Sequence, residues 1–272
     1  MIPISIGDFE RANPEIKAVQ PSRSRVEYYF TCTPAVPLYV LGKNPAIDVI
    51  TYLDADLYFF SDPAPIFDEL GAGSILIIEH RFPDGLRHLE KYGRFNVGVL
   101  SFRNDGEGLR CLSTWRQQCI AWCYDRLEDD RYADQKYLDR WPAQFNNLVV
   151  AKHKGANVAP WNVFRYSVHV RDGIVKIDEQ DLIVYHFHQL KLVSSWVCDP
   201  GLWRYGAGQG FQEIRNYIYR PYLTALKRAS GELQRKASSP PGTRYGNRSV
   251  LGSMTRSLLR GQLMFSRGGF AH

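Results

Sequence analysis

The stretch YLDADLYFFSDP, residues 52–63, carries two carboxylates, Asp54 and Asp56, among strongly apolar neighbours. An ionised carboxylate in an apolar setting is costly unless it is paired, hydrogen-bonded or bound to a metal. In an extended segment residues i and i+2 point to the same side, so the pair would form a compact set of hard oxygen ligands. Mg²⁺ and Mn²⁺ prefer such ligands. The pattern therefore indicates a divalent-metal site, with a pair of solvated turn residues as the alternative.

Two further patches place polar residues next to apolar segments. RFNVGVLSFRND puts Asn96 and Gly98 inside an apolar strand, where a glycine often marks the close approach of a ligand. YADQKYLDRWP brings Asp134 and Gln135 to the head of a short predicted helix. Each patch is a weak signal when it is taken alone.

A third patch, IVYHFHQLK, ends a predicted strand with His186, His188 and Lys191. A histidine can supply a metal ligand, and a lysine can neutralise a phosphate. A lone histidine at a strand end is usually structural, so this patch also gains its meaning from the others.

Strands alternating with helices must position these side chains. The apolar, β-branched run DVITYL, residues 48–53, predicts a strand covered on both faces. Apolar residues at helical spacing predict two short helices that meet around Pro34 and Pro37. Further strands are expected at residues 74–78, 95–102, 148–152 and 182–188, and further helices at 62–70 and 104–127. This alternation favours an α/β sandwich with a largely parallel central sheet, which binds ligands beyond the carboxyl ends of its strands.

The composition excludes several classes of protein. Of the 272 residues 44% are hydrophobic and 23% are charged, so the chain is not a disordered, collagen-like or disulfide-scaffold protein. Five cysteines without a CxxC pair indicate reduced thiols and an intracellular setting. No apolar run approaches ~18 residues, and the N-terminus lacks the features of a signal peptide. We therefore expect a cytoplasmic protein.

The positive charge is concentrated at the C-terminal end. Seven cations and no acidic residue follow Glu232, so removing these seven from the net charge of +6 leaves about −1 for the rest of the chain. We predict a folded domain over residues 1–236 and a basic, mostly disordered tail over residues 237–272. The tail is a candidate for peripheral contact with the inner face of a membrane, the alternative being a solvated end. We expect no nucleic-acid partner.

Taken in order, YLDADLYFFSDP, FNVGVLSF, ADQKYL and YHFHQLK resemble the motifs of GT-A glycosyltransferases, most closely the retaining enzymes of glycosyltransferase family 8 and their bacterial relatives. That family has a strand ending in Asp-x-Asp, then Phe-Asn-x-Gly-Val, then Asp-Gln before a helix, then His-Phe/Tyr near a Lys. The resemblance covers roughly residues 20–200. It implies a GT-A fold and the transfer of a sugar, with retention, from a nucleotide-sugar donor such as a UDP-sugar to a glycan or lipid-linked acceptor.

The resemblance implies a metal site made by Asp54, Asp56 and His186. These residues would hold the Mn²⁺ or Mg²⁺ that bridges the donor's diphosphate. The family's last motif continues with Gly and then Lys-Pro-Trp, whereas this chain has Gln189 and no Pro-Trp. This departure leaves His188 as an alternative to His186.

The resemblance also implies residues for the donor and for catalysis. Asn96 would touch the donor sugar or the metal-bound diphosphate, with Gly98 beside it. Asp134 and Gln135 would lie by the anomeric carbon and the acceptor. Lys191 would neutralise the charge of the departing phosphates. Because the metal acts as a Lewis acid on the leaving group, no proton need be delivered to that group.

The start of the chain departs from the family's pattern. GT-A folds open with a strand and a loop that hold the nucleobase, some tens of residues before the region matching RSRVEYYF. Here 22 residues precede that region. We therefore expect the natural protein to have residues upstream of Met1 that begin with an apolar strand of about five residues.

Two other functions are consistent with the same residues. A degenerate, non-catalytic relative would bind a nucleotide, a glycan or a partner protein. LDADLYFF also resembles the motif of haloacid-dehalogenase-like phosphatases, with Asp54 as nucleophile and Asp56 as acid. Leu57 and Tyr58 stand where that motif has a Gly-Thr-type turn, and no convincing acidic pair follows late in the chain.

Overall fold

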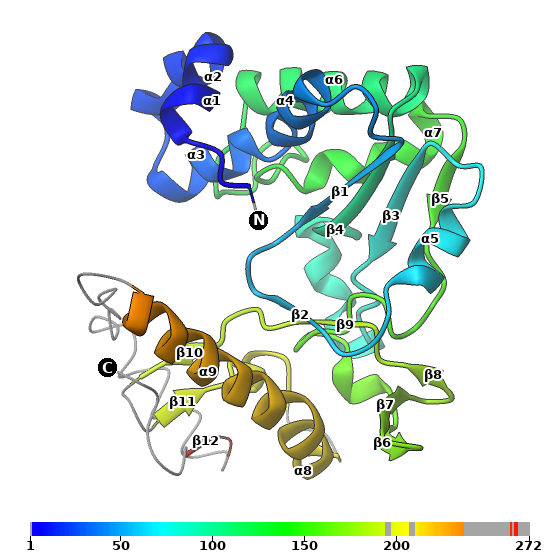
Figure 1. The fold of residues 1–272 in the computed structure, drawn as a ribbon. Coiled ribbons are helices and arrows are strands. Elements are labelled where there is room, and N and C mark those ends of the chain that lie inside the picture. Colours follow the sequence, from blue (N-terminus) through cyan, green and yellow to red (C-terminus); the bar gives the residue numbers. More distant parts are fainter. Residues whose placement is uncertain (1, 194–196, 207–209, 237–261, 263, 266–272) are drawn as a thin grey trace. The chain divides into compact units, whose positions relative to one another are not determined.

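The computed structural model describes residues 2–193, 197–206, 210–236, 262, 264 and 265 (Figure 1). The chain divides into two compact units, which are Met1–Ala55 with Ala64–His153 and Asp56–Pro63 with Lys154–His272. One boundary between the units directly follows Ala55. Asp54 therefore belongs to the first unit and Asp56 to the second.

The first unit contains a sheet with the strand order β1-β4-β3-β5 (Figure 1). Its strands span Val49–Leu53 (β1), Ile75–Glu79 (β3), Phe95–Arg103 (β4) and Leu148–Val150 (β5). β4 is antiparallel to both β1 and β3, whereas β3 and β5 are parallel. The strands β1, β3 and β5 therefore run in one direction and β4 runs against them. The predicted α/β class is confirmed, and the sheet departs from a parallel arrangement only at β4 among its described strands.

β1 lies at an edge of this sheet and is less buried than the sequence predicts. Its residues Val49 to Tyr52 are half-buried, and Leu53 is exposed. The apolar run predicted a strand covered on both faces, and this prediction is wrong. β1 pairs with one strand only among the described residues, whereas the interior strands β3 and β4 are almost wholly buried.

Three of the predicted helices form where the sequence placed them. α3 (Arg25–Cys32) and α4 (Ala35–Lys43) are the two pieces that meet at Pro34. α5 (Ala64–Leu70) ends at Gly71, whose φ of +49° is a conformation that suits glycine. The first unit also contains α1 (Ile6–Ala12), α2 (Pro14–Val19), η1 (Gln20–Ser22), η2 (Asp84–Tyr92), η3 (Lys136–Arg140) and α7 (Trp141–Gln144).

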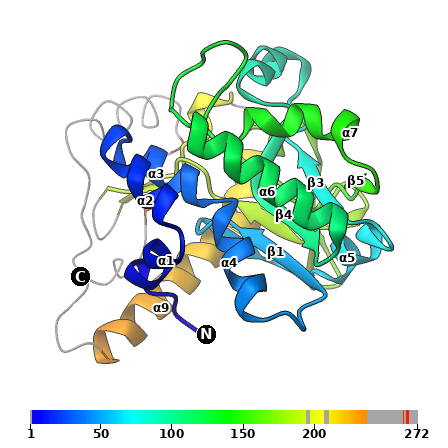
Figure 2. The same cartoon turned by 90° about the horizontal axis from the view of Figure 1, so that it is seen from above.

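The long helix α6 (Gly106–Ala121) packs over β4 and β3 (Figure 2). Leu112, Trp115 and Cys119, which recur at helical spacing in the predicted segment, are fully buried, whereas Leu127 at its predicted end lies beyond the helix and is exposed. The helix ends earlier than the predicted residue 127. Trp122 adopts an extended conformation, and its carbonyl accepts a hydrogen bond from the Tyr137 hydroxyl at 2.7 Å instead of continuing the helix.

The second unit is built from small antiparallel sheets, described as β2-β9, β6-β7-β8 and β10-β11-β12. The strands are β2 (Leu57–Phe59), β6 (Val168–Arg171), β7 (Ile174–Ile177), β8 (Gln180–Asp181), β9 (Val184–His186), β10 (Lys191–Leu192), β11 (Val197–Asp199) and β12 (Met264–Phe265). The helical segments are η4 (Val163–Arg165), η5 (Leu202–Arg204), α8 (Phe211–Ile214), η6 (Arg215–Tyr219) and α9 (Arg220–Lys236). The aromatic rings of Tyr185, Phe187 and Tyr219 pack together in its core.

Most of the predicted tail, residues 237–272, lies outside the described residues. Within it, Met264 and Phe265 form β12, which pairs with β11, and the Met264 side chain is buried. None of the helices in the described ranges combines the length and the apolar character needed to cross a membrane.

Candidate active site

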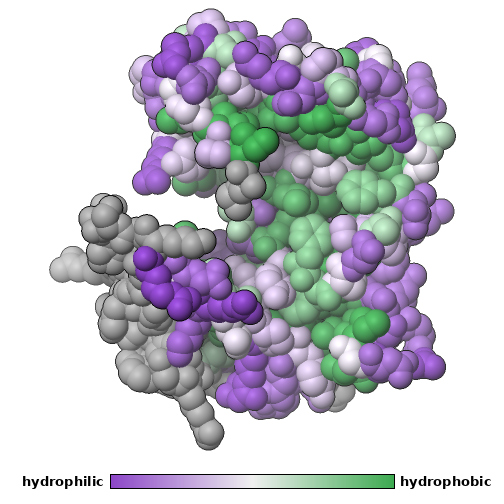
Figure 3. Space-filling view, in the orientation of Figure 1, coloured by the Kyte–Doolittle hydropathy of each residue, from purple (hydrophilic) through white to green (hydrophobic). Residues whose placement is uncertain are grey.

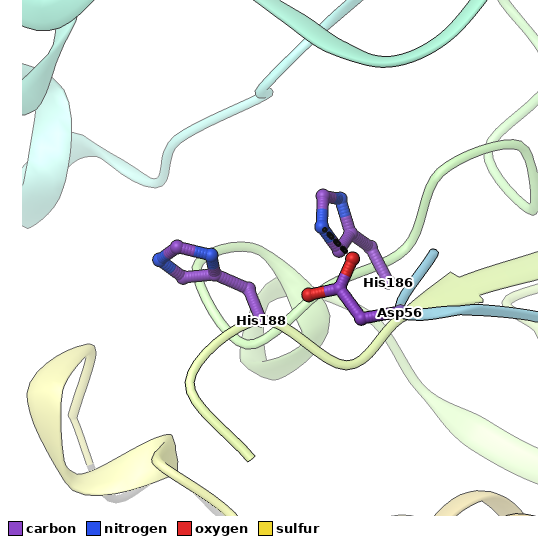
Figure 4. Close-up of side chains that lie close together, drawn as sticks. All are labelled: Asp56, His186 and His188. Atoms are coloured by element: carbon purple, nitrogen blue, oxygen red, sulfur yellow. Dashed lines mark ion pairs between the residues drawn. The ribbon is translucent and has the colours of Figure 1, made fainter. Parts of the chain in front are cut away.

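Three side chains of the second unit form a cluster with the composition of a metal site. The ligand atoms of Asp56, His186 and His188 all lie within 4.8 Å of one another. Figure 4 shows the Asp56 carboxylate between the two imidazole rings, with one oxygen facing His186. The cluster therefore joins two of the patches that the sequence singled out, although these patches are far apart along the chain.

Strand pairing brings the two patches together. β2 and β9 are antiparallel, and the backbone N–H of Phe187 donates to the Asp56 carbonyl at 2.8 Å. His186 and His188 flank Phe187, whose ring is buried in the core of the second unit. Because side chains alternate along an extended segment, the burial of Phe187 turns both histidines toward the opposite side, where Asp56 lies.

The cluster favours the protonation states that bind a metal. Nε2 of His186 lies 2.9 Å from Oδ1 of Asp56. Burial opposes the charge of Asp56, but the hydrogen bond from His186 and the attraction of both imidazoles outweigh it and lower the pKa of this carboxyl. Burial, and next the neighbouring His186, lower the pKa of His188 to about 4. Near pH 7 Asp56 is ionised and His188 is neutral, which are the ligating forms.

Aromatic side chains surround the two histidines. The ring of Trp161, which is 4% exposed, has its centroid 5.2 Å from that of His186 and 5.5 Å from that of His188. The Tyr205 ring lies 6.3 Å from both His188 and Trp161. Such packing fixes the orientation of the imidazoles and limits the access of water to them.

Gln189 stands where the resembled family has a glycine, and its backbone adopts a conformation typical of glycine. Its φ is +65°, in the left-handed region that disfavours a side chain by about 1 kcal/mol. Nε2 of Gln189 lies 3.4 Å from Nε2 of His188. At this position the side chain differs from the family's pattern, but the backbone has the left-handed conformation that glycine readily adopts.

A carboxylate and two imidazoles make a mixed oxygen and nitrogen donor set. Mg²⁺ takes oxygen ligands in strict octahedral geometry, so two imidazoles fit a first-row transition ion such as Mn²⁺ better. Asp56, His186 and His188 together would leave coordination positions for the oxygen atoms of a substrate. The donor set therefore suits a divalent transition ion better than Mg²⁺.

Asp54 belongs to the first unit, at the carboxyl end of β1. Its backbone N–H donates to the Gly98 carbonyl at 3.0 Å, and its Oδ1 accepts from the Tyr52 hydroxyl at 2.8 Å. The expectation that Asp54 and Asp56 lie on one continuous extended segment is wrong. β1 ends at Leu53, and a turn follows that is formed by Ala55 and Asp56.

Asp134 is a buried acid near Asp54. Burial raises the pKa of Asp134 to about 7; the charge of Asp54 also raises it, and a hydrogen bond with Thr33 opposes the rise. The indole N–H of Trp115 donates to the Asp134 carbonyl at 2.8 Å and fixes the backbone there. A carboxyl group that titrates near neutral pH can both accept and donate a proton.

Gln135, next in the chain, is tied to the end of η2. Its Nε2 donates to the Tyr92 carbonyl at 3.1 Å. Its side chain also lies against Gly93, where an added Cβ would come within 3.0 Å of the Gln135 Cγ. These contacts hold the side chain at the start of η3, beside Asp134.

Asn96 and Gly98 lie on β4, near the edge of the sheet where β1 and β3 end. Asn96 is 5% exposed, and its Oδ1 accepts from the Gly98 backbone N–H at 2.9 Å. Its Nδ2 lies 3.4 Å from Nε2 of His80, a buried residue that follows β3 and stacks on Phe82. No sequence motif singled out His80, although SILIIEH places it after an apolar strand as YLD places Asp54.

Lys191, the predicted phosphate partner, lies in the second unit. It is half-buried on β10, opposite Asp199 of β11 in the strand register. The second unit therefore contains Lys191 together with the three residues of the metal cluster.

The fold and the cluster define the chain as a mixed α/β protein with a candidate divalent-metal centre. The chain is 36% identical over 228 residues to the uncharacterized protein YfnD of Bacillus subtilis (strain 168), a match that covers 83% of this chain and 72% of YfnD. The uncharacterized protein YfnF of the same strain is 34% identical over 192 residues, covering 67% of this chain and 63% of YfnF. The chain belongs to the family of YfnD. No family model matches the sequence.

Two solved structures resemble part of the chain. One is a glycosyltransferase involved in the glycosylation of the major capsid of PBCV-1, with 11% identity and a TM-score of 0.42 over 61% of this chain and 73% of that chain. The other is the galactosyltransferase LgtC in complex with donor and acceptor sugar analogs, with 20% identity and a TM-score of 0.35 over 52% of this chain and 53% of that chain. TM-scores of this size establish neither a common fold nor a common function.

Proposed function

We propose that the protein is a metal-dependent glycosyltransferase. It would move a sugar from a nucleotide sugar, in particular a UDP-sugar, to a glycan or lipid-linked acceptor with retention of the anomeric configuration. One observation carries this proposal. Two motifs that the family resemblance assigns to a single metal, the one with Asp56 and the one with His186, contribute to one cluster in the second unit.

The proposed roles follow from the chemistry of glycosyl transfer. The bond between the anomeric carbon and the diphosphate breaks, and a bond to an acceptor oxygen forms. A metal bound by Asp56, His186 and His188 would neutralise charge on the departing diphosphate. Lys191 would act on the same charge from β10.

The residues of the first unit would act on the sugar and the acceptor. Asn96 and Gly98 would contact the donor. Asp134 and Gln135 would lie beside the anomeric carbon and the acceptor, and the pKa of Asp134 near 7 suits proton exchange with an acceptor hydroxyl. For Asp54 as a further metal ligand, the proposal rests on the resemblance alone.

The phosphatase alternative is disfavoured by the state of Asp56. That mechanism needs Asp56 to donate a proton as an acid. Its carboxyl instead accepts a hydrogen bond from His186, and its pKa lies below the ordinary value. An ionised carboxylate of this kind is suited to binding a metal and poorly suited to donating a proton.

Calorimetric titration of the full-length protein tests the metal-dependent donor site. UDP, GDP and ADP are titrated with and without Mn²⁺, and we expect one of them to bind only when Mn²⁺ is present. Asp56→Asn should abolish this binding, whereas Asp172→Asn, a change in an exposed turn between β6 and β7, should not affect it. Absence of binding by the wild-type protein would instead favour the non-catalytic alternative.

The stereochemical part of the proposal has its own test. Proton NMR of the earliest product formed from a UDP-sugar reports the configuration at the anomeric carbon. We expect the donor's configuration to be retained. An inverted product would contradict the roles assigned to Asp134 and Gln135 while leaving the metal site in place.

A further inference from the structure

A turn of the second unit packs backbone to backbone against the segment that follows His188. Gly201 has a φ of +73°, and an added Cβ at this position would lie 2.7 Å from the Cβ and 2.8 Å from the carbonyl oxygen of Gln189. The Asp199 carboxylate accepts a hydrogen bond from the Gly201 N–H at 3.0 Å and fixes the turn. The residues after Gly201 are therefore held beside the metal cluster.

The short helix η5 begins at this turn and places Arg204 near His188. Leu202 is fully buried, and the N–H groups of Arg204 and Tyr205 bond back to the carbonyls of Gly201 and Leu202. The Tyr205 ring lies 6.3 Å from the His188 ring. Arg204 directly precedes Tyr205 in the chain and therefore belongs to the same turn beside His188.

Arg204 has the properties of a residue that can bind an anion. Its side chain is exposed, and it forms no ion pair with any residue of the described ranges. Its guanidinium lies 5.0 Å from the ring centroid of Trp203, which limits its freedom without neutralising its charge. A guanidinium can donate two parallel hydrogen bonds to a phosphate, which an ammonium cannot do.

We propose that Arg204 binds the diphosphate of the nucleotide donor beside the metal cluster, as a second cation in addition to Lys191. This inference rests on the proposed function. A nucleoside diphosphate carries more negative charge than a divalent ion bound to Asp56 can neutralise, and Arg204 is the cation that the packing of Gly201 against Gln189 brings to the site. Arg204 would thereby distinguish a diphosphate from a monophosphate.

The test is calorimetry on the full-length protein and its Arg204→Gln and Arg204→Lys variants. The probes are Mn²⁺ alone, Mn²⁺ with UDP, Mn²⁺ with UMP and Mn²⁺ with pyrophosphate. We expect Arg204→Gln to weaken binding of UDP and pyrophosphate at least tenfold and to change the affinities for Mn²⁺ and UMP less than twofold. Arg204→Lys should recover part of the loss, because it restores the charge without the bidentate geometry.

The matched control is Arg171→Gln, which removes an exposed arginine from the β6–β7 hairpin of the same unit. It should bind every probe as the wild type does. If the wild type binds Mn²⁺ with UDP and Arg204→Gln binds it equally well, the inference about Arg204 is wrong and the proposed function stands. If the wild type binds neither UDP nor pyrophosphate with Mn²⁺, the proposed function itself fails.

Discussion

At the residue scale, the buried carboxyl group of Asp134 makes the stability of the fold depend on pH. The Asp134 side chain is 4% exposed, and its pKa of about 7 compares with 3.8 for an unperturbed group. Between these values the folded state holds a proton that the unfolded state has released. Stability is therefore fully present below pH 3.8 and decreases as the pH rises to about 7. The total loss is on the order of 4 kcal/mol.

Asp134→Asn should remove this dependence. The amide cannot ionise, so the variant should exceed the wild type in free energy of unfolding at pH 8 by ~2–4 kcal/mol and differ little from it at pH 4. Urea denaturation at both pH values measures this. Asp84→Asn, which alters an exposed aspartate of the same unit, should leave the pH dependence unchanged. Equal pH slopes for wild type and Asp134→Asn would show that Asp134 is ionised in the folded state at neutral pH.

The sequence assigned the role of metal ligand differently to the two histidines of the cluster. The resemblance favoured His186 and kept His188 as an alternative, whereas both lie in the cluster with Asp56. We expect His186→Ala and His188→Ala each to weaken Mn²⁺ binding at least tenfold, because each would remove a proposed ligand. His169→Ala on β6 provides the control. Titration of Mn²⁺ followed by electron paramagnetic resonance measures the affinities. Unchanged affinity in His188→Ala would reduce the ligand set to Asp56 and His186.

At the scale of elements, Gly155 fixes the position of β9, the strand that carries His186. The Gly155 carbonyl accepts from the N–H groups of Ile183 and Val184 at the start of β9. An added Cβ at Gly155 would lie 1.7 Å from the Asp181 carbonyl oxygen, so the backbones could not keep this separation. The placement of β9, and with it of His186, depends on the absence of a side chain at this position.

Gly155→Ala should therefore destabilise the protein by ~3 kcal/mol or more, through a backbone clash that no rotamer relieves. It should also weaken Mn²⁺ binding, since β9 carries the proposed ligand His186. Gly231→Ala is the matched control in α9, where an added Cβ meets nothing within 4 Å. This change should stabilise the protein by ~0.5–1 kcal/mol through helix propensity. Urea denaturation compares both variants with the wild type, and similar stabilities would contradict the predicted clash.

Local patterns predicted most of the elements of the first unit. Apolar β-branched runs gave β1, β3 and β4, and apolar residues at helical spacing gave α3, α4 and the stripe of α6. The errors at β1 and β4 concern long-range pairing, which no local pattern contains. The apolar residues of β1 do not reveal an edge strand, and the direction of β4 depends on its neighbours. Likewise YLDADLY indicated both aspartates, but not the turn at Ala55 and Asp56.

At the scale of the whole molecule, positive charge extends from α9 into the C-terminal residues. α9 carries five cations and one acidic residue, Glu232, and Figure 3 shows hydrophilic side chains along it. Beyond Lys236 the sequence has five arginines and no acidic residue. Leu258 and Leu259 add apolar side chains to this segment. Cations interspersed with apolar residues are typical of segments that bind an anionic lipid surface.

We therefore expect the full-length protein to bind vesicles containing phosphatidylserine and not vesicles of phosphatidylcholine alone. Each cation near an anionic surface contributes ~1 kcal/mol, so a variant that loses five should bind far more weakly. In that variant the arginines replaced by glutamine are Arg244, Arg248, Arg256, Arg260 and Arg267. A matched variant replaces three cations of α9, Arg220, Lys227 and Arg228, and should lose less of the vesicle binding.

Co-sedimentation at two salt concentrations measures the binding, which should fall as salt screens the charges. Equal sedimentation of the wild type and the five-arginine variant would show that the C-terminal segment is a solvated end, and would remove the membrane as the site where a lipid-linked acceptor is met.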